Sequence, residues 1–163
     1  MRKRGVVAGV VGATILASAA VTASLRRFRI VDDSMEPALS DGDFVIARRR
    51  AGALQRGIVV VTAHPEGQPI SLVKRVIGLQ GERIGIDGGR VTVNGALLAD
   101  RWANGSSRPN GEWDVPEDHV WLLSDNRGAT VADGRTFGPT PISDIDWVVA
   151  SRYYPASRAG RIA

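Results

Sequence analysis

The chain contains no cysteine, so it has no disulfide framework, no thiolate nucleophile and no cysteine-based metal site. Aromatic residues make up 6% of the sequence and provide no stacking platform beside the arginine run at residues 48–50, which argues against nucleic-acid binding. The two histidines, His64 and His119, lie among turn-forming residues and predict neither a metal site nor a Ser-His-Asp triad. We therefore expect no cofactor.

Lysine is also scarce, because Lys3 and Lys74 are the only lysines among the 21 basic residues. An arginine guanidinium does not deprotonate in a protein, whereas a buried lysine amine can, so position 74 is compatible with a titratable amine. The alternative, which the residues alone favour, is a surface lysine beside Arg75. The apolar neighbours Leu72 and Val76 are expected to desolvate this amine and lower its pKa. Such an amine can take the proton of a serine hydroxyl, and Ser34 is the candidate nucleophile.

The 163 residues, 44% of them hydrophobic, suffice for one domain around one core. Residues 5–25 are uncharged, rich in Val, Ala, Ile and Leu, and lie between two basic clusters. Their number is close to the roughly 20 residues of a spanning helix, which predicts a transmembrane anchor within residues 1–27. A cleaved signal peptide is the alternative, because residues 17–19 (Ala-Ser-Ala) resemble a small-residue cleavage site.

After the anchor, short apolar alternations separated by Gly, Pro, Asn and Asp predict a mainly β domain over residues 28–163. The turn at residues 87–89 (Asp-Gly-Gly) predicts a hairpin. Residues 99–117 are polar and predict a long excursion or small insertion. Further strands are expected near residues 28–31, 44–48, 58–62, 70–77, 120–123 and 147–153.

Three stretches of the chain form an ordered set: residues 31–43 around Ser34, residues 72–81 around Lys74, and residues 124–138, which begin Ser-Asp-Asn-Arg. In their order and spacing they resemble the boxes of bacterial type I signal peptidases, serine–lysine proteases, in a compact form with a single anchor. The resemblance covers residues 28–154. It implies a signal-peptidase-like β fold of coiled antiparallel sheets with a small insertion.

The resemblance further implies a membrane-anchored serine endopeptidase that removes signal peptides from exported preproteins after a small-x-small motif. Ser34 would attack the scissile carbonyl, and Lys74 would act as general base through an acyl-enzyme. A single-pass anchor would hold the catalytic domain on the extracytoplasmic side of the cytoplasmic membrane. The expected partners are signal peptides and the lipid bilayer, with no nucleic acid, and we expect a monomer.

Supporting roles also follow from the resemblance. Thr130 best matches the hydroxyl residue that orients the lysine amine, although this alignment needs one extra residue in the third stretch. Arg75 is the expected partner of Asp125. For Leu39 and Val73, core packing is an equally good interpretation. The supporting network would comprise Arg75, Asp125, Arg127, Asp133 and Arg135, and shallow substrate pockets would be lined by Phe28, Ile30, Met35, Leu39, Leu72 and Val73.

Four positions depart from the family pattern: Asp32 stands where serine or glycine is common, Ala38 where threonine is frequent, Gln80 where proline is common and Ser124 where glycine is usual. An ionised Asp32 cannot donate a hydrogen bond to an oxyanion, which leaves the Ser34 backbone N–H as the expected donor. Two other functions stay open. One is a self-cleaving serine–lysine protease of the stress-response repressor type, although no DNA-binding helical domain is evident. The other is a non-catalytic, membrane-tethered β module that binds extended peptides.

Overall fold

The computed structural model describes residues 24–162, so most of the expected anchor, residues 1–27, lies outside the described residues. Within residues 24–162, no helix is long and apolar enough to cross a membrane. The first strand, β1 (Leu25–Arg29), begins inside the stretch assigned to the anchor and its basic flank. The backbone from Leu25 onward is paired with β2, and the extent of the anchor before it stays a prediction.

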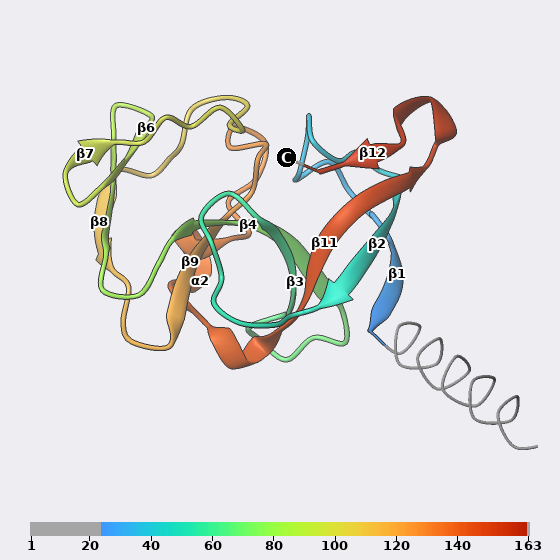
Figure 1. The fold of residues 1–163 in the computed structure, drawn as a ribbon. Helices are drawn as coiled ribbons and strands as arrows, with labels where there is room; N and C mark the ends of the chain where they lie inside the picture. The colour runs from blue at the N-terminus through green and yellow to red at the C-terminus, as the bar shows by residue number, and fades with distance from the viewer. Residues whose placement is uncertain (1–23, 163) are drawn as a thin grey trace, which may run out of the picture.

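The large sheet contains eight antiparallel strands in the order β1-β2-β11-β3-β4-β9-β10, with β12 beside β11 (Figure 1). The long strand β11 shifts register against β2 between Val149 and Ser151 and again between Arg152 and Tyr154. Such bulges bend a strand and increase its twist. The remaining strands of this sheet are β2 (Phe44–Arg49), β3 (Val59–Ala63), β4 (Ser71–Gly78), β9 (His119–Leu123), β10 (Thr140–Pro141), β11 (Ile145–Tyr154) and β12 (Gly160–Arg161).

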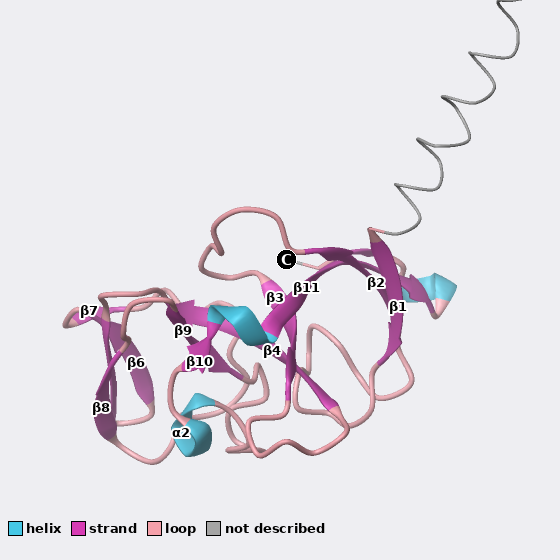
Figure 2. Cartoon of the chain, turned by 90° about the horizontal axis from the view of Figure 1, so that it is seen from below, coloured by secondary structure: helices cyan, strands magenta, loops and turns pink. Residues whose placement is uncertain are grey.

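A smaller sheet, at the left of Figures 1 and 2, has the order β7-β6-β5-β8. The predicted hairpin is confirmed, because Asp87 pairs with Arg90 and the two glycines between them have φ of 54° and 82°, as this tight turn requires. The excursion at residues 99–117 contains an edge strand of this sheet, which sequence patterning missed because the strand is short and mostly polar. The strands are β5 (Arg83–Asp87), β6 (Arg90–Val93), β7 (Ala96–Leu97) and β8 (Gly111–Asp114).

The mainly β prediction is confirmed, since the helices in the described part of the chain are single turns: α2 (Gly134–Phe137), η1 (Ile142–Asp144) and η2 (Ala156–Arg158). The pleat of β3 sends Val59 and Val61 into one hydrophobic cluster with Met35, and Val60 into another with Leu122. A third cluster joins the two sheets, where the rings of Trp113 and Trp121 lie 4.9 Å apart between centroids.

Candidate active site

Ser34 lies on the turn that joins β1 to β2. Two backbone hydrogen bonds close the base of this turn, from the Ile30 N–H to the Asp43 carbonyl at 2.8 Å and from the Gly42 N–H to the Ile30 carbonyl at 3.1 Å. The side chain of Met35 is buried in the core, with 1% of its surface exposed. The turn is thus anchored from within, and the Ser34 side chain remains partly exposed at its tip.

Lys74 projects from β4 and is only 3% exposed. Burial removes water from its ammonium group and lowers the pKa of Lys74 below the ordinary value. The carboxylates of Asp32, Asp133 and Asp125 act in the opposite direction and raise this pKa, whereas the Arg135 guanidinium lowers it further. Desolvation outweighs the carboxylates, so the neutral amine that a general base requires forms at lower pH than for a lysine in water.

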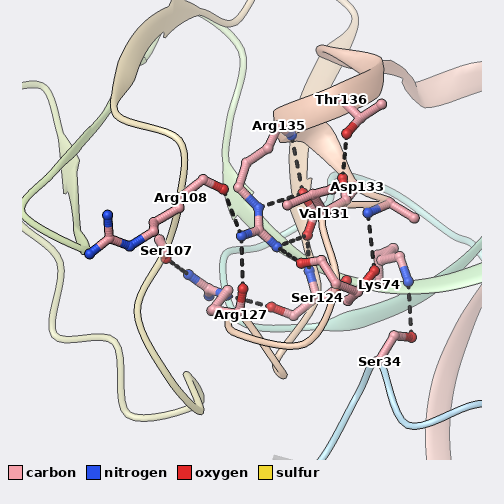
Figure 3. Close-up of polar contacts among 12 residues, drawn as sticks. Ser34, Lys74, Ser107, Arg108, Ser124, Arg127, Val131, Asp133, Arg135 and Thr136 are labelled. Carbon is pink, nitrogen blue, oxygen red and sulfur yellow. Dashed lines mark hydrogen bonds and ion pairs between the residues drawn. The ribbon is translucent and has the colours of Figure 1, made fainter.

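The Lys74 Nζ and the Ser34 Oγ are hydrogen bonded at a distance of 3.0 Å, although the two residues are 40 positions apart in the chain (Figure 3). A serine hydroxyl becomes a competent nucleophile when an adjacent base takes its proton. A desolvated amine at hydrogen-bonding distance meets this geometric condition. The structure therefore brings together the two residues on which the sequence-based hypothesis depends.

Arg75 and Asp125 form a fully buried ion pair beside the dyad. The Arg75 Nε and Nη2 donate to Asp125 Oδ1 and Oδ2 at 2.7 and 2.6 Å. Burial raises the pKa of Asp125, and the Arg75 guanidinium opposes that rise. Because successive side chains on a strand point to opposite faces, this pair braces β4 from the side opposite Lys74.

Asp133 and Arg135 form a second buried pair at the start of α2, with Arg135 Nη2 donating to Asp133 Oδ2 at 2.8 Å. Asp133 also accepts the Ser124 N–H at 2.9 Å, which ties α2 to the end of β9. Burial pushes the pKa of Asp133 up, but these hydrogen bonds outweigh burial and leave the pKa below its ordinary value. Arg127 lies in the same network, because its carbonyl accepts a hydrogen bond from Arg135 Nη1 at 2.9 Å (Figure 3). Its guanidinium pairs with Asp100 at 2.8 Å.

Thr130 is the residue expected to orient the lysine amine. Its Oγ1 accepts the Ala132 N–H at 3.1 Å, and its carbonyl accepts a hydrogen bond from Arg135. Within residues 24–162, the hydrogen-bond partner of the Lys74 amine is Ser34. Accepting the Ala132 N–H leaves the Thr130 O–H free to donate, and an orienting role for Thr130 stays a prediction.

Asn126 is a site residue that sequence reasoning missed. Its backbone N–H donates to the Ser34 carbonyl at 2.9 Å, and its side-chain amide donates to the Asp33 carbonyl at 3.1 Å. These two bonds tie the third sequence stretch, residues 124–138, directly to the turn that carries the nucleophile. The sequence offered one signal for this role: Asn126 lies between Asp125 and Arg127, both of which were expected in the supporting network.

Asp32 engages the expected oxyanion donor. Its Oδ1 accepts the Ser34 backbone N–H at 2.8 Å, so the group expected to face the oxyanion is already bonded to a carboxylate. The backbone of Asp32 has φ of 81°, a left-handed conformation that Asp tolerates better than most residues. The sequence showed that Asp32 cannot donate while ionised, but not that its side chain turns back onto the nucleophile's own N–H.

A cavity of about 460 Å³ adjoins Ser34 and Lys74. Leu39 does not line it: this side chain is fully buried and packs with Met35 in the core, so the core-packing interpretation holds for Leu39. Val73 does line the cavity. The other expected pocket residues that line it are Phe28, Ile30, Met35 and Leu72, and the lining also includes Arg26, Arg29 and Ile70, which sequence reasoning did not assign to the pocket.

A serine hydroxyl on the β1–β2 turn, hydrogen bonded to a desolvated lysine amine on β4, fits a serine hydrolase. The sequence profile of the family described as signal peptidase, peptidase S26, matches residues 3–154. The chain belongs to this family, and it is a peptidase.

Individual relatives agree with this assignment. The chain is 33% identical over 147 residues to a signal peptidase I of Leptolyngbya laminosa, covering 82% of this chain and 70% of the relative. It is 32% identical over 127 residues to mitochondrial inner membrane protease subunit 1 of Schizosaccharomyces pombe, covering 75% of this chain and 69% of the relative. The fold is similar to the crystal structure of a signal peptidase I from Enterococcus faecalis, with a TM-score of 0.50, 23% identity, and coverage of 59% of this chain and 96% of that one.

Proposed function

We propose that this protein is a membrane-anchored serine endopeptidase that removes N-terminal signal peptides from exported preproteins, with Ser34 as nucleophile and Lys74 as general base. The observation that supports it most is the 3.0 Å hydrogen bond between Lys74 Nζ and Ser34 Oγ, with the lysine 3% exposed and its pKa lowered by burial. Family membership supports the same reaction, the hydrolysis of a peptide bond.

In the proposed mechanism, the neutral amine of Lys74 accepts the Ser34 hydroxyl proton as Oγ attacks the scissile carbonyl carbon. The tetrahedral intermediate collapses, its C–N bond breaks, and the Lys74 ammonium returns the proton to the leaving amine. The acyl group is then an ester on Ser34. Lys74 next takes a proton from water, which attacks this ester, and the Ser34 alkoxide leaves and regains the proton.

The proposed substrate is an extended segment with small side chains on either side of one exposed residue. Two features support this. The cavity beside Ser34 is mostly apolar in its lining, and residues 71–74 of β4 pair with β3 on one side only, since β9 pairs with β4 from Arg75 onward. An unpaired strand edge can accept a peptide through main-chain hydrogen bonds. Within the described residues, β1 likewise pairs only with β2.

We further propose a single-pass anchor in residues 5–25, with the catalytic domain on the extracytoplasmic side of the cytoplasmic membrane. The uncharged stretch between two basic clusters supports the anchor, and a relative named as an inner membrane protease is consistent with a membrane location. Signal peptides and the bilayer are the proposed partners of a monomeric enzyme that binds no nucleic acid.

The test is incubation of the purified full chain, in detergent or lipid, with a precursor that contains a small-x-small site. We expect cleavage after that site by the wild type and by a control, Ser143→Ala, which changes an exposed serine outside the site. Ser34→Ala, Lys74→Ala and Lys74→Arg should each lose about 10²–10⁴-fold or more in rate. Retained activity in Lys74→Arg would contradict the assignment of the base, because arginine does not deprotonate.

The non-catalytic peptide-binding module disagrees with membership of a peptidase family, and only an enzyme inactivated by the bond from the Ser34 N–H to Asp32 would behave as one. In that case the wild type would bind the precursor without cutting it, and the Ser34 and Lys74 variants would bind equally well. Cleavage of the protein at one of its own bonds, without cleavage of the precursor, would instead indicate the self-cleaving type.

A further inference from the structure

The Asp32 carboxylate occupies the position where the reaction needs a free hydrogen-bond donor. In serine hydrolases a backbone N–H near the nucleophile stabilises the negative oxygen of the tetrahedral intermediate. Here the Ser34 N–H is 2.8 Å from Asp32 Oδ1 and donates to it. A carboxylate and an oxyanion cannot share this donor at low cost, because like charges at such distances repel.

The turn holds Asp32 in this arrangement through its own hydrogen bonds. The Asp32 N–H donates to Asp41 Oδ1 at 3.3 Å, and the Asp41 N–H donates to Asp33 Oδ1 at 3.2 Å. The left-handed φ of 81° at Asp32 lets its side chain fold back over the next two residues. All three aspartates are exposed, so the Asp32 carboxylate can rotate into water without crossing packed core.

The same carboxylate also acts on the general base. Of the charged groups that affect the Lys74 amine, Asp32 on the β1–β2 turn raises the pKa of Lys74 most. Asp133 at the start of α2 and Asp125 after β9 raise it less, and Arg135 lowers it. Asp32 therefore favours the protonated lysine, which cannot accept the serine proton.

We propose that Asp32 limits turnover by holding the Ser34 N–H in the resting enzyme, and that productive substrate binding must displace its carboxylate from that N–H. Asp32 lines the substrate cavity together with Arg26 and Arg29, so a displaced carboxylate stays within a region of positive charge. A peptide that fills this cavity and pairs with the strand edges supplies the binding energy for displacement. A peptide that fits poorly does not supply enough binding energy to displace the carboxylate. Asp32 is therefore a determinant of substrate selection. This inference rests on the proposed serine–lysine mechanism.

The experiment compares Asp32→Gly and Asp32→Asn with the wild type on a precursor that has a small-x-small site. Both replacements tolerate a positive φ, so the turn is expected to fold. Glycine frees the N–H completely, whereas asparagine keeps a similar shape without the charge. We expect kcat to rise about 10-fold in Asp32→Gly, a part of the 10²–10³-fold that one oxyanion donor provides, and to rise less in Asp32→Asn.

The pH profile separates this role from a merely structural one. Removing the Asp32 carboxylate removes a group that favours the charged amine, so the midpoint of the rising limb of kcat/KM should move to lower pH in both variants. Asp118→Asn is the matched control, because it makes the same charge change at an exposed aspartate that also has a positive φ, 57°, but lies outside the site. Its kcat and its midpoint should stay close to those of the wild type.

A loss of kcat in Asp32→Gly with the fold intact by circular dichroism would overturn the proposal, because it would mean that the carboxyl group assists the reaction. An unchanged kcat with an unchanged midpoint in both variants would overturn it too. These results differ from failure of the proposed function itself, in which neither the wild type nor either Asp32 variant cleaves any precursor.

Discussion

The backbone N–H of Asn126 donates a hydrogen bond to the carbonyl of Ser34 at 2.9 Å, which fixes the nucleophile's backbone to the segment after β9. The Asn126 side chain adds a bond to the Asp33 carbonyl at 3.1 Å. Since Asp125 pairs with Arg75, and Arg75 follows Lys74 on β4, one short segment positions both members of the dyad. The distance between base and nucleophile therefore depends on residues that take no part in the chemistry.

Asn126→Ala should lower kcat/KM by about 10-fold, because the Ser34 turn loses one of its two links and a misplaced reacting group is costly in rate. The loss of the hydrogen bond should reduce the free energy of unfolding by only about 1 kcal/mol. Steady-state kinetics and thermal unfolding measure the two effects. Asn110→Ala removes a comparable 3.1 Å bond, to Asp87, far from the site, and should leave the rate unchanged. Equal rate losses in the two variants would refute the positioning role of Asn126.

Lys74→Met should abolish cleavage and stabilise the fold at neutral pH. The lowered pKa of Lys74 means that folding disfavours its charged form, and each unit of such a shift corresponds to about 1.4 kcal/mol. The penalty is largest below the folded-state pKa and shrinks as pH rises toward 10.5, the ordinary pKa of lysine. The advantage of the methionine variant in urea unfolding should therefore decrease from neutral to alkaline pH, while the wild-type rate rises with pH. An advantage that is constant across this range would contradict a desolvated amine.

Asp125→Ala should destabilise the protein by about 3–5 kcal/mol, because it leaves the Arg75 guanidinium in a buried position without its carboxylate. Asp114→Ala is the matched control, since it breaks an ion pair with Arg83 of similar geometry, 2.7 Å, in which both side chains are largely exposed. That variant should unfold at nearly the same urea concentration as the wild type. Similar midpoints for the two variants would show that the buried pair contributes no more than a surface one.

Gly78→Ala should destabilise the fold by about 1–3 kcal/mol through overpacking. A Cβ at this position would lie 2.6 Å from Ile84 Cδ1 and 2.8 Å from Trp121 Cβ, where the end of β4 meets β5 of the smaller sheet. Gly160→Ala serves as the control, because a Cβ there meets no atom within 4 Å. Chemical unfolding of the two variants should give a clear loss for the first and almost none for the second. If Gly78→Ala is as stable as Gly160→Ala, the contact between the sheets is looser than the structure indicates.

The sequence motifs predicted the dyad because serine, lysine and their neighbours are specific in type and order. The hairpin at residues 87–89 was predictable for a local reason, since two successive glycines provide the positive φ that its turn needs. The edge strand β8 was not predicted, because Gly111–Asp114 is polar and short and is defined only by its pairing with β5. Its partner is almost 30 residues away in the chain, and a pattern within residues 99–117 cannot reveal it.

The hydrogen-bond partners of side chains were less predictable than the secondary-structure elements. That Arg75 pairs with Asp125 followed from charge and the family pattern, but that the hydroxyl of Thr130 accepts a neighbouring N–H did not. Asp32 shows the same limit, because its turn back onto the Ser34 N–H depends on a local left-handed backbone angle. Such contacts depend on rotations about single bonds in the side chain and backbone. The residue type restricts these torsion angles but does not determine them.

The alternation of β4 decides which of two adjacent cations becomes reactive. Val60 lies opposite Lys74 and Val59 opposite Arg75, on the two faces of the sheet. A slip of one residue between β3 and β4 would exchange these faces, presenting a permanently charged guanidinium to the serine and enclosing the amine with Asp125. The double substitution Lys74→Arg with Arg75→Lys would preserve composition and net charge. It would still abolish catalysis, because the pleat of β4 alone determines which of the two side chains faces Ser34.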